Sequence, residues 1–295
     1  MILKRVITDR LTNVWMIVAL ILILLLPVII AVALYLKSLP ILESIRLADL
    51  LFSNDWAPAN GKFGFWPFIT GSLYVTVLSF LFAAPVTLLA AIYLTQYATQ
   101  RLIKFMHPVI DILAGLPSVI YGVWGILIIV PFISKVVAPL FNTSSSGYSI
   151  LAGGVVLAVM CIPYMLNMLI EVFKGIPVEL TEASLSMGAT QWESIKHVNL
   201  KKGMPGIISA FGLGLAKAFG ETLAVMMVVG NMVKLTWNPL DPGYPLPALI
   251  ANNYGEMLSV PQYDSALMLA ALILLVVILL INLVFRYFIY KTRVT

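Results

Sequence analysis

The sequence has few of the residues on which most enzymes and metalloproteins depend. Among 295 residues there is one cysteine, there are two histidines, and only 11% of the side chains are charged. Cys161 has no second thiol for a disulfide or a metal site, and His107 and His197 lack the spacing of a metal pair. No G-x-x-x-x-G-K-[ST] loop for nucleotide phosphates occurs. We therefore expect that this chain binds no metal or cofactor and is not itself an enzyme.

Apolar residues dominate the chain instead. They make up 61% of it, with a mean hydropathy of +1.02, whereas a soluble domain has about 45–50% apolar and about 25% charged residues. Six apolar runs are long enough, at about 1.5 Å per residue, to cross about 30 Å of hydrocarbon as helices. The sequence therefore predicts an all-α, polytopic membrane protein with six transmembrane helices, at residues 14–36, 68–95, 109–134, 149–171, 207–231 and 265–285.

The segments between these runs differ in their basic residues. With the N-terminus inside, the inner segments hold twelve of the 18 Lys and Arg residues, the outer segments hold five, and Lys217 lies within the fifth run. Cytoplasmic loops usually carry this excess, so we expect both termini in the cytoplasm and the chain in the inner membrane. No basic stripe indicates nucleic acid as a partner. A signal peptide is the alternative for the first run, but its 23 residues exceed the usual 7–15 or so.

The runs divide the chain into three expected parts. These are an N-terminal segment with the first span and an outer loop (1–67), a core of five spans with an inner loop at 172–206 (68–290), and a cytoplasmic tail (291–295). The two outer loops, 37–67 and 232–264, are long and contain prolines. They suggest a docking surface for an external partner, although loops of this kind also serve only as connections.

The inner loop contains residues that typically start and end two short helices. Pro177 suits a first helical position and Gly188 suits the residue after a helix, while Leu180, Ala183 and Met187 recur at helical spacing between them. This pattern predicts a first helix that ends at Gly188.

A second short helix is expected at 189–198. Thr190 and Glu193 match a capping box, in which each side chain bonds to the other's backbone N–H, and Trp192 and Ile195 would share one face. An exposed, capped helix with a tryptophan suits insertion into a partner's groove. The alternative is an amphipathic helix resting on lipid headgroups.

The same loop resembles the EAA loop of ABC importer permeases. The resemblance rests on Glu182-Ala183-Ser184, on Gly188, and on Val198 and Leu200. It implies a type I importer with a MetI-like permease domain, in which this loop docks on an ATPase subunit. The residues implied in that coupling are Glu182, Ala183, Gly188, Thr190, Trp192 and Glu193.

Further segments resemble one branch, the phosphate-specific importer permeases of the C type (PstC). They are Gly71 to Thr76 and Ala91 to Ala98, Ala114 to Gly122, and Gly220 to Val225 with Gly230 and Asn231. The resemblance implies a permease subunit that moves inorganic phosphate across the membrane. Its implied partners are a homologous PstA-type permease, two PstB-type ATPases that hold the ATP and Mg, and an external PstS-type phosphate-binding protein.

Other functions remain open. The nearest is an ABC permease for another oxyanion or small solute, because the inner loop specifies coupling and not cargo. An ion-coupled secondary transporter would usually show internal repeats, and none is visible between the two halves of the chain. A non-transporting membrane or signalling protein is a third alternative.

The fifth run contains the expected substrate path. Lys217 and Glu221 stand four residues apart, on one face if the helix continues, and a charge at the bilayer centre costs about 2.5–3.5 kcal/mol. Lys217 would attract an oxyanion while Glu221 accepts a hydrogen that hydrogen phosphate has and sulfate lacks. The alternative is a structural ion pair. Thr222 and Thr76 complete the predicted path, although Thr76 equally suits helix packing.

Small residues suggest how the helices pack. Gly212, Ala216 and Gly220 form a stripe that lets another helix approach closely, either in the same bundle or in a second subunit. Gly115 and Pro117 in the third run predict either a broken helix or a simple proline kink.

Overall fold

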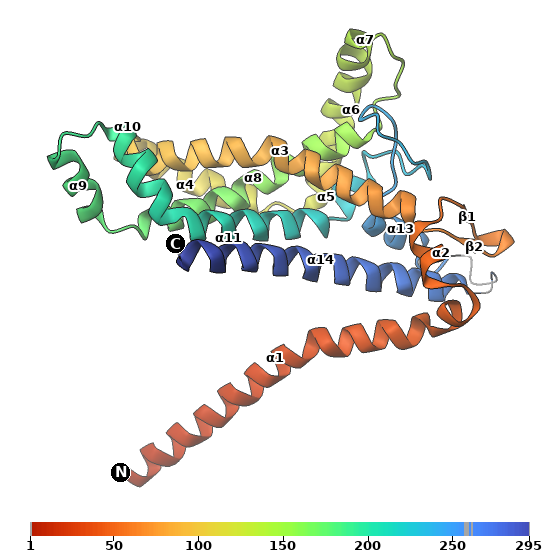
Figure 1. Ribbon diagram of the computed structural model, residues 1–295, viewed down its shortest axis with the longest axis horizontal. Coiled ribbons are helices and arrows are strands. Elements are labelled where there is room, and N and C mark those ends of the chain that lie inside the picture. The colour runs from red at the N-terminus through yellow and green to blue at the C-terminus, as the bar shows by residue number, and fades with distance from the viewer. Residues whose placement is uncertain (1, 257–259, 261, 295) are drawn as a thin grey trace.

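Long helices laid side by side form the body of the protein. The computed structural model describes residues 2–256, 260 and 262–294, with side chains from residue 10 to residue 292. Lys4, Arg5 and Arg293, which contribute to the charge bias above, lie outside the described side chains. The bundle consists of α3 (Trp66–Gln96), α8 (Ile150–Lys174), α11 (Leu200–Phe219) and α14 (Tyr263–Val294) (Figure 1).

The all-α membrane fold is confirmed. In the described part of the chain, five helices are long and apolar enough to cross a membrane: Arg10–Ser44, Trp66–Gln96, Ser118–Leu140, Ile150–Lys174 and Tyr263–Thr292. The fifth predicted span, 207–231, is not among these five helices; it corresponds to α11 and the short helix α12 (Leu223–Met226) and is interrupted between them. The number of crossings and the side on which the termini lie stay predictions.

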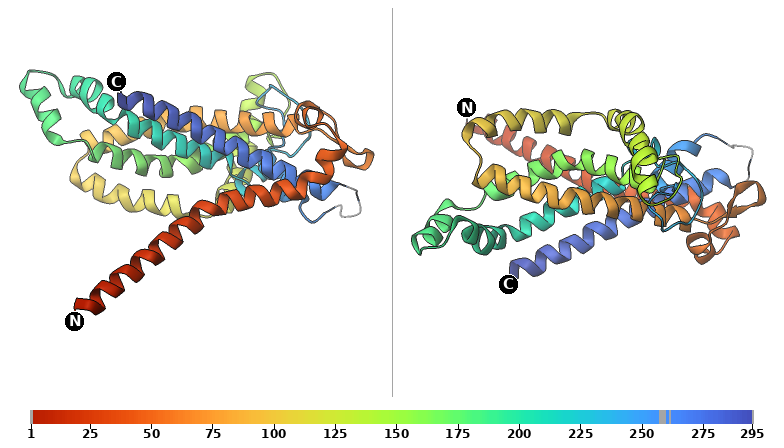
Figure 2. Two further views of the ribbon diagram at one scale, coloured as in Figure 1. Left: turned by 60° about the horizontal axis from the view of Figure 1, so that its bottom comes forward. Right: turned by 90° about the horizontal axis from the view of Figure 1, so that it is seen from above.

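The first helix is longer than its apolar run. α1 spans Ile2–Ser44 and contains Pro27 and Pro40, where a span of 14–36 is predicted. Its C-terminal half lies against α14, while its N-terminal half diverges from the bundle (Figures 1 and 2). None of its most apolar window is buried.

The third predicted span is broken. α4 (Gln100–Gly115) ends where Leu116 and Pro117 adopt extended backbone, with ψ of 134° and 139°. Helical structure then resumes from Ser118 to Leu140 as α5 (Ser118–Trp124), α6 (Val130–Phe132) and α7 (Ala138–Leu140), joined by π-helical turns. This segment projects steeply from the bundle (Figures 1 and 2). The broken helix expected at Gly115 and Pro117 is therefore found, but a continuous span over 109–134 is wrong.

Glycines allow the bundle helices to approach closely. A Cβ on Gly154 of α8 would lie 2.9 Å from the Leu78 side chain of α3, and one on Gly212 of α11 would lie 2.6 Å from Phe285 of α14. Gly220 also faces α14, at Ile278. The small-residue stripe of α11 therefore packs within its own bundle.

The outer end of the bundle is capped by short elements. They are α2 (Leu47–Phe52), an antiparallel pair of β1 (Trp56–Ala57) and β2 (Lys62–Phe63), the 3-10 turn η1 (Pro58–Asn60), and α13 (Leu246–Asn253). Trp56 lies edge-on to Phe68, with ring centroids 4.9 Å apart, and also contacts Tyr263. The segments predicted as outer loops are thus largely folded onto the bundle; residues 257–259 and 261 of the second one lie outside the described residues.

The inner loop contains one separate helix, not two. α9 (Val178–Ser186) stands alone, whereas α10 (Gln191–Ser194) continues through a π-helical turn (Ile195–Asn199) into α11. The expected independent second helix at 189–198 is therefore wrong, because helical backbone continues without a break to Phe219.

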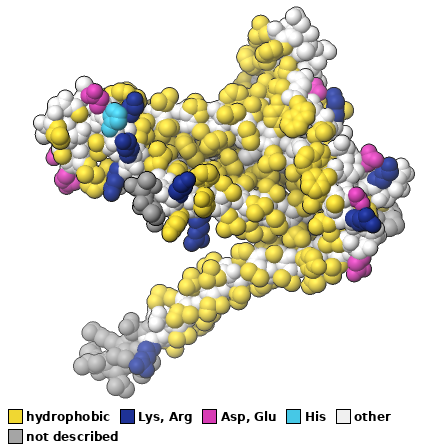
Figure 3. Space-filling view, viewed as in Figure 1, with side chains coloured by type: hydrophobic (Ala, Val, Ile, Leu, Met, Phe, Trp, Pro, Cys, Tyr) yellow, Lys and Arg dark blue, Asp and Glu magenta, His cyan; other side chains and the backbone are white. Residues whose placement is uncertain are grey.

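Apolar and charged side chains separate along the bundle. Figure 3 shows a broad apolar belt over the middle of the helices, with charged side chains gathered at the α9 and α10 end and at the β1 and β2 end. This distribution is typical of a protein whose long axis crosses a bilayer.

Candidate functional site

The first candidate site is the exposed inner loop formed by α9 and α10. α9 begins directly after Pro177 and has no buried residue. It ends at Ser186, and Gly188, two residues later, has a φ of +89° and open space around it. Gly188 therefore stands just after the helix, as predicted for a helix cap, and Pro177 precedes the first helical residue instead of occupying it.

The capping box at the start of α10 is confirmed. The backbone N–H of Thr190 donates to Oε2 of Glu193 at 2.8 Å, and the N–H of Glu193 donates to Oγ1 of Thr190 at 3.3 Å. The bonds from the backbone and hydroxyl of Thr190 lower the pKa of Glu193 below its ordinary value. The carboxylate therefore stays ionised at the helix start, where its charge also favours the helix dipole.

Apolar side chains project from this loop. Met187 is 90% exposed and Trp192 is 51% exposed, and Leu180 and Leu185 are also exposed. Ile195 is fully buried, so the expected common environment of Trp192 and Ile195 is wrong. Glu182 and Ala183 lie on α9 with exposed side chains. A cluster of exposed apolar residues outside the apolar belt is typical of a surface that a partner covers.

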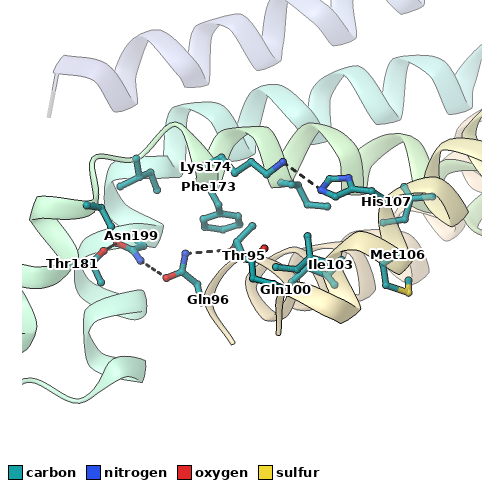
Figure 4. Close-up of a pocket in the computed structure, with 15 residues that line it drawn as sticks. Thr95, Gln96, Gln100, Ile103, Met106, His107, Phe173, Lys174, Thr181 and Asn199 are labelled. Carbon is teal, nitrogen blue, oxygen red and sulfur yellow. Dashed lines mark hydrogen bonds between the residues drawn. The ribbon is translucent and has the colours of Figure 1, made fainter. Parts of the chain in front are cut away.

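A network of amide groups ties the loop to the bundle. The side-chain amide of Gln191 donates to the backbone oxygen of Gln96 at 2.6 Å, and that of Asn199 donates to Oε1 of Gln96 at 3.1 Å. The Thr181 hydroxyl donates to Oδ1 of Asn199 at 3.0 Å (Figure 4). α9, the π-helical turn and the end of α3 therefore share one hydrogen-bonded junction.

The second candidate site is the break at the end of α11. The helix ends at Phe219, Gly220 follows, and α12 starts at Leu223. Lys217 and Glu221 are therefore not on one face of a continuous helix, and the geometry predicted for them is wrong. Gly220 caps α11 with a φ of −87° and a ψ of −2°, although the apolar run of the sequence continues past it.

Lys217 and Glu221 have different partners. The Lys217 ammonium lies 4.2 Å from the ring centroid of Tyr164 on α8, which is a cation–π distance. An oxygen of Glu221 accepts from the backbone N–H of Ala224 at 3.4 Å, at the start of α12. Both residues are described, and they form no ion pair with each other within 4.0 Å. The alternative of an ion pair within the helix is therefore not found, while an ion pair across a subunit interface stays a prediction.

Thr76 and Glu221 meet at a small cavity. Ser72, Thr76, Phe219 and Glu221 are among the residues that line it, and its volume of about 10 Å³ is close to what one water molecule needs. Thr76 is only 4% exposed. Thr222 lies beside the break, where its hydroxyl donates to the oxygen of Gly220 at 3.4 Å. The structure therefore brings Thr76 and Glu221 together at this cavity, whereas Thr222 and Lys217 are not among the residues that line it.

The contacts made by Tyr164 and Gln96 in these sites have no visible signal in the sequence. Tyr164 is 53 positions from Lys217, and Gln96 is about 100 residues from Asn199 and Gln191. Only the packing of α3 and α8 against α11 brings these residues together. No local spacing could have indicated them.

Comparison with known proteins identifies a family for most of the chain. Residues 83–294 match the family described as binding-protein-dependent transport system inner membrane component. That range covers α4 to α14 and so includes the inner loop and the break at Gly220, but it begins after Thr76.

Three curated relatives are similar over most of the chain. A probable ABC transporter permease of Bacillus subtilis, YqgH, is 39% identical over 81% of this chain and 76% of its own. The phosphate transport system permease PstC of Xylella fastidiosa is 35% identical over 78% and 74%. A probable PstC of Methanocaldococcus jannaschii is 34% identical over 88% and 86%.

Solved structures share the fold. An inward-facing structure of the MetNI methionine ABC transporter matches with a TM-score of 0.59 at 20% identity, over 77% of this chain and 96% of that chain. An amino acid ABC transporter matches with a TM-score of 0.51 at 15% identity, over 76% and 92%. At these identities the likeness concerns the fold alone.

Proposed function

The chain belongs to the family of binding-protein-dependent transport system inner membrane components, and we propose that it is a permease subunit of an ATP-driven importer of inorganic phosphate. The observation that carries the cargo is the similarity to PstC proteins, which reaches 34% identity over 274 residues in one of them. The relatives support the proposed cargo, and the geometry of this chain supports the mechanism that we propose below.

The partners follow from the proposed family role. We assign one subunit of an ATPase pair to the inner loop, because Met187 and Trp192 are exposed on it, on either side of the capping box of α10. The ATPases carry the ATP and Mg. A homologous second permease completes the membrane unit, and an external phosphate-binding protein delivers the cargo at the opposite end.

The energy of ATP enters through the helix that begins at Gln191. Closure of the ATPases moves Trp192, and the continuous helical backbone carries this movement along α11 to the break at Gly220. Alternating access then follows from two arrangements of that break, one open outward and one open inward. In this scheme the N-terminus lies inside, in the inner membrane.

The break is the proposed point where phosphate passes. Glu221 accepts a hydrogen bond from protonated phosphate, Thr76 and Thr222 donate hydroxyls, and Lys217 balances the negative charge. For this step Lys217 leaves the face of Tyr164. A cation–π contact of about 0.5–2 kcal/mol is weak enough to be exchanged for an anion.

Phosphate uptake tests this proposal directly. Vesicles that contain the complete complex, with ATP inside, are compared for the native chain, Glu221→Gln and Glu43→Gln. Glu43 is exposed on α1, far from the break, and undergoes the same chemical change. We expect Glu221→Gln to lower uptake by at least about tenfold, the effect of one lost charged hydrogen bond, while Glu43→Gln matches the native chain.

Two results would contradict parts of the proposal. Normal uptake by Glu221→Gln removes the break from the substrate path. If the native complex takes up sulfate or molybdate in preference to phosphate, the cargo is wrong even though the family assignment stands.

A further inference from the structure

One large cavity in the described structure has no part in the proposed transport cycle. It has a volume of about 520 Å³ and lies between the end of α3, α4, the end of α8 and α9. Cavities of this size commonly hold small ligands. It adjoins the inner loop but lies at the opposite end of α11 from the break at Gly220 (Figures 1 and 4).

The lining of this cavity changes from apolar to polar between its floor and its rim. Leu94, Ile110, Ile170 and Phe173 are buried at the floor. At the rim, Gln100 and Lys174 are exposed. A ligand that fills this space therefore needs an apolar part and a polar part.

The rim of the cavity also carries a positive charge, that of Lys174. Nζ of Lys174 lies 3.4 Å from Nε2 of His107, both of which line the cavity (Figure 4). Since an ammonium is a donor only, Nε2 of His107 is the acceptor in this contact. No carboxylate is among the lining residues, so the polar part of the ligand meets one positive charge.

Two further groups at the rim are available to a ligand. Lys174 also bonds Glu171 at 3.1 Å, but both side chains are largely exposed, and such surface pairs contribute little. The side-chain amide of Gln100 makes no hydrogen bond to the described part of the chain. By contrast, Gln96, Thr181 and Asn199 are bonded to one another on the far wall.

We propose that this cavity binds an anionic phospholipid of the inner leaflet, with its phosphodiester at Lys174 and Gln100 and part of an acyl chain over Phe173. A free phosphate ion shares the headgroup chemistry, but it leaves the buried apolar floor uncovered. A phosphodiester carries a single negative charge, which matches the one lysine.

The position of the cavity fits a phospholipid as the ligand. The neighbouring face of α4 carries exposed Arg101 and Lys104 beside exposed Phe105, a combination typical of a helix at a membrane surface. Basic pockets at the cytoplasmic side of helix bundles suit anionic headgroups. The inference rests on the orientation proposed above but not on the cargo. A bound lipid would also contact Thr181 and Asn199, and so would brace the inner loop.

Lipid retention tests the inference without any transport assay. The complete complex is purified from phosphatidylcholine membranes with and without phosphatidylglycerol, and the lipid retained per complex is counted by native mass spectrometry. We expect phosphatidylglycerol to be retained in preference to phosphatidylcholine. Added inorganic phosphate should not displace it.

Two pocket variants and two matched controls separate the headgroup from the tail. Lys174→Gln removes the rim charge, and Lys202→Gln makes the same change at an exposed site outside the cavity. Ile103→Trp fills the cavity. Ile112→Trp is its control, because Ile112 lies on the same helix, α4, and is 65% exposed. We expect Lys174→Gln to lower retention about fivefold and Ile103→Trp to abolish it, while both controls match the native chain.

Other outcomes overturn the inference. Equal retention by the pocket variants and their controls places the lipid elsewhere. Displacement by inorganic phosphate makes this a site for the free ion, and equal retention of phosphatidylcholine removes the role of the charge. Retention by the isolated chain but not by the complex means that a partner subunit fills the cavity.

Discussion

The two ends of the bundle are built in opposite ways. At the outer end, Trp56, Phe65, Phe68 and Tyr263 form a buried aromatic cluster in which Phe65 and Phe68 have no exposed surface. At the inner end, α9 has no buried residue at all, and Met187 is almost fully exposed. The aromatic cluster at the outer end is packed within the chain, whereas α9 buries none of its side chains.

This difference predicts that the stability of the chain depends mainly on the outer end and that its coupling to an ATPase depends mainly on the inner end. Changes at the outer end should lower the stability of the chain, since they remove contacts made within it. Changes at the inner end should spare the fold but weaken the link to an ATPase. The following variants test that division, in order of decreasing effect on stability.

The largest expected effect belongs to Phe68→Ala in the outer cluster. Removing a fully buried phenylalanine costs about 3–5 kcal/mol through lost burial and the cavity left behind. Thermal unfolding of the detergent-solubilised chain measures it. Phe105→Ala, at a phenylalanine 68% exposed on α4, should change the midpoint little; equal losses in both variants would mean that the outer cluster does not stabilise the fold.

A smaller loss is expected from Gly64→Ala at the same end. A Cβ at Gly64 meets the backbone oxygen of Ser53 and lies 2.9 Å from that of Asp55, so the cap must shift, at a cost of about 1–3 kcal/mol. The same unfolding assay is used. Gly115→Ala is the control, because a Cβ there meets nothing within 4 Å. An unchanged midpoint for Gly64→Ala would show that the cap yields without cost.

Gly188→Trp should separate coupling from stability at the inner end. The positive φ of Gly188 makes any side chain unfavourable by about 1–2 kcal/mol, and the indole would project where the ATPase docks. We expect normal folding but loss of ATPase co-purification and of ATP-driven uptake. Gly61→Trp is a matched control, since Gly61 also has a positive φ (+67°) and open surroundings, but at the outer end. If both variants keep uptake, the inner loop is not the coupling surface.

The smallest effect concerns the capping box. Because the pKa of Glu193 is lowered in the folded chain, its contribution is present above the unfolded pKa of about 4.3 and is lost as the pH falls through the lower folded value. Hydrogen exchange at the Thr190 amide should therefore speed up over that range, after correction for intrinsic rates. In Glu193→Gln the protection should not vary with pH there; the same pH dependence in both would assign it to another group.

The fold could be predicted from the sequence wherever a local pattern determines it. Apolar length identified α3, α8 and α14, and Thr190 with Glu193 identified the start of α10, because capping depends on residues three apart. The third and fifth spans were less predictable. Their apolar runs continue through Pro117 and Gly220, so hydropathy alone joins segments that the backbone separates.

For the candidate sites, the sequence could predict which residues take part but not how those residues are arranged in space. Lys217 and Glu221 stand out because charges in an apolar run are rare, but their shared face was inferred from a helix that ends at Phe219. The contact of Lys217 with Tyr164 depends on how α8 packs on α11. The transport roles of Lys217, Glu221, Thr222 and Thr76 therefore stay predictions until uptake is measured.

Because the helical backbone is continuous from α10 to α11, a movement of the inner loop can be transmitted along the helix as along a lever. From Gln191 to Phe219 the helix is about 40 Å long at 1.5 Å per residue, and its interior widens only at the π-helical turn Ile195–Asn199. A small tilt imposed at Trp192 about a pivot near Asn199 becomes a larger sideways movement at Phe219, because that arm is several times longer. The ratio between the movement at Phe219 and the movement at Trp192 would then depend on the position of the π-helical turn along the helix.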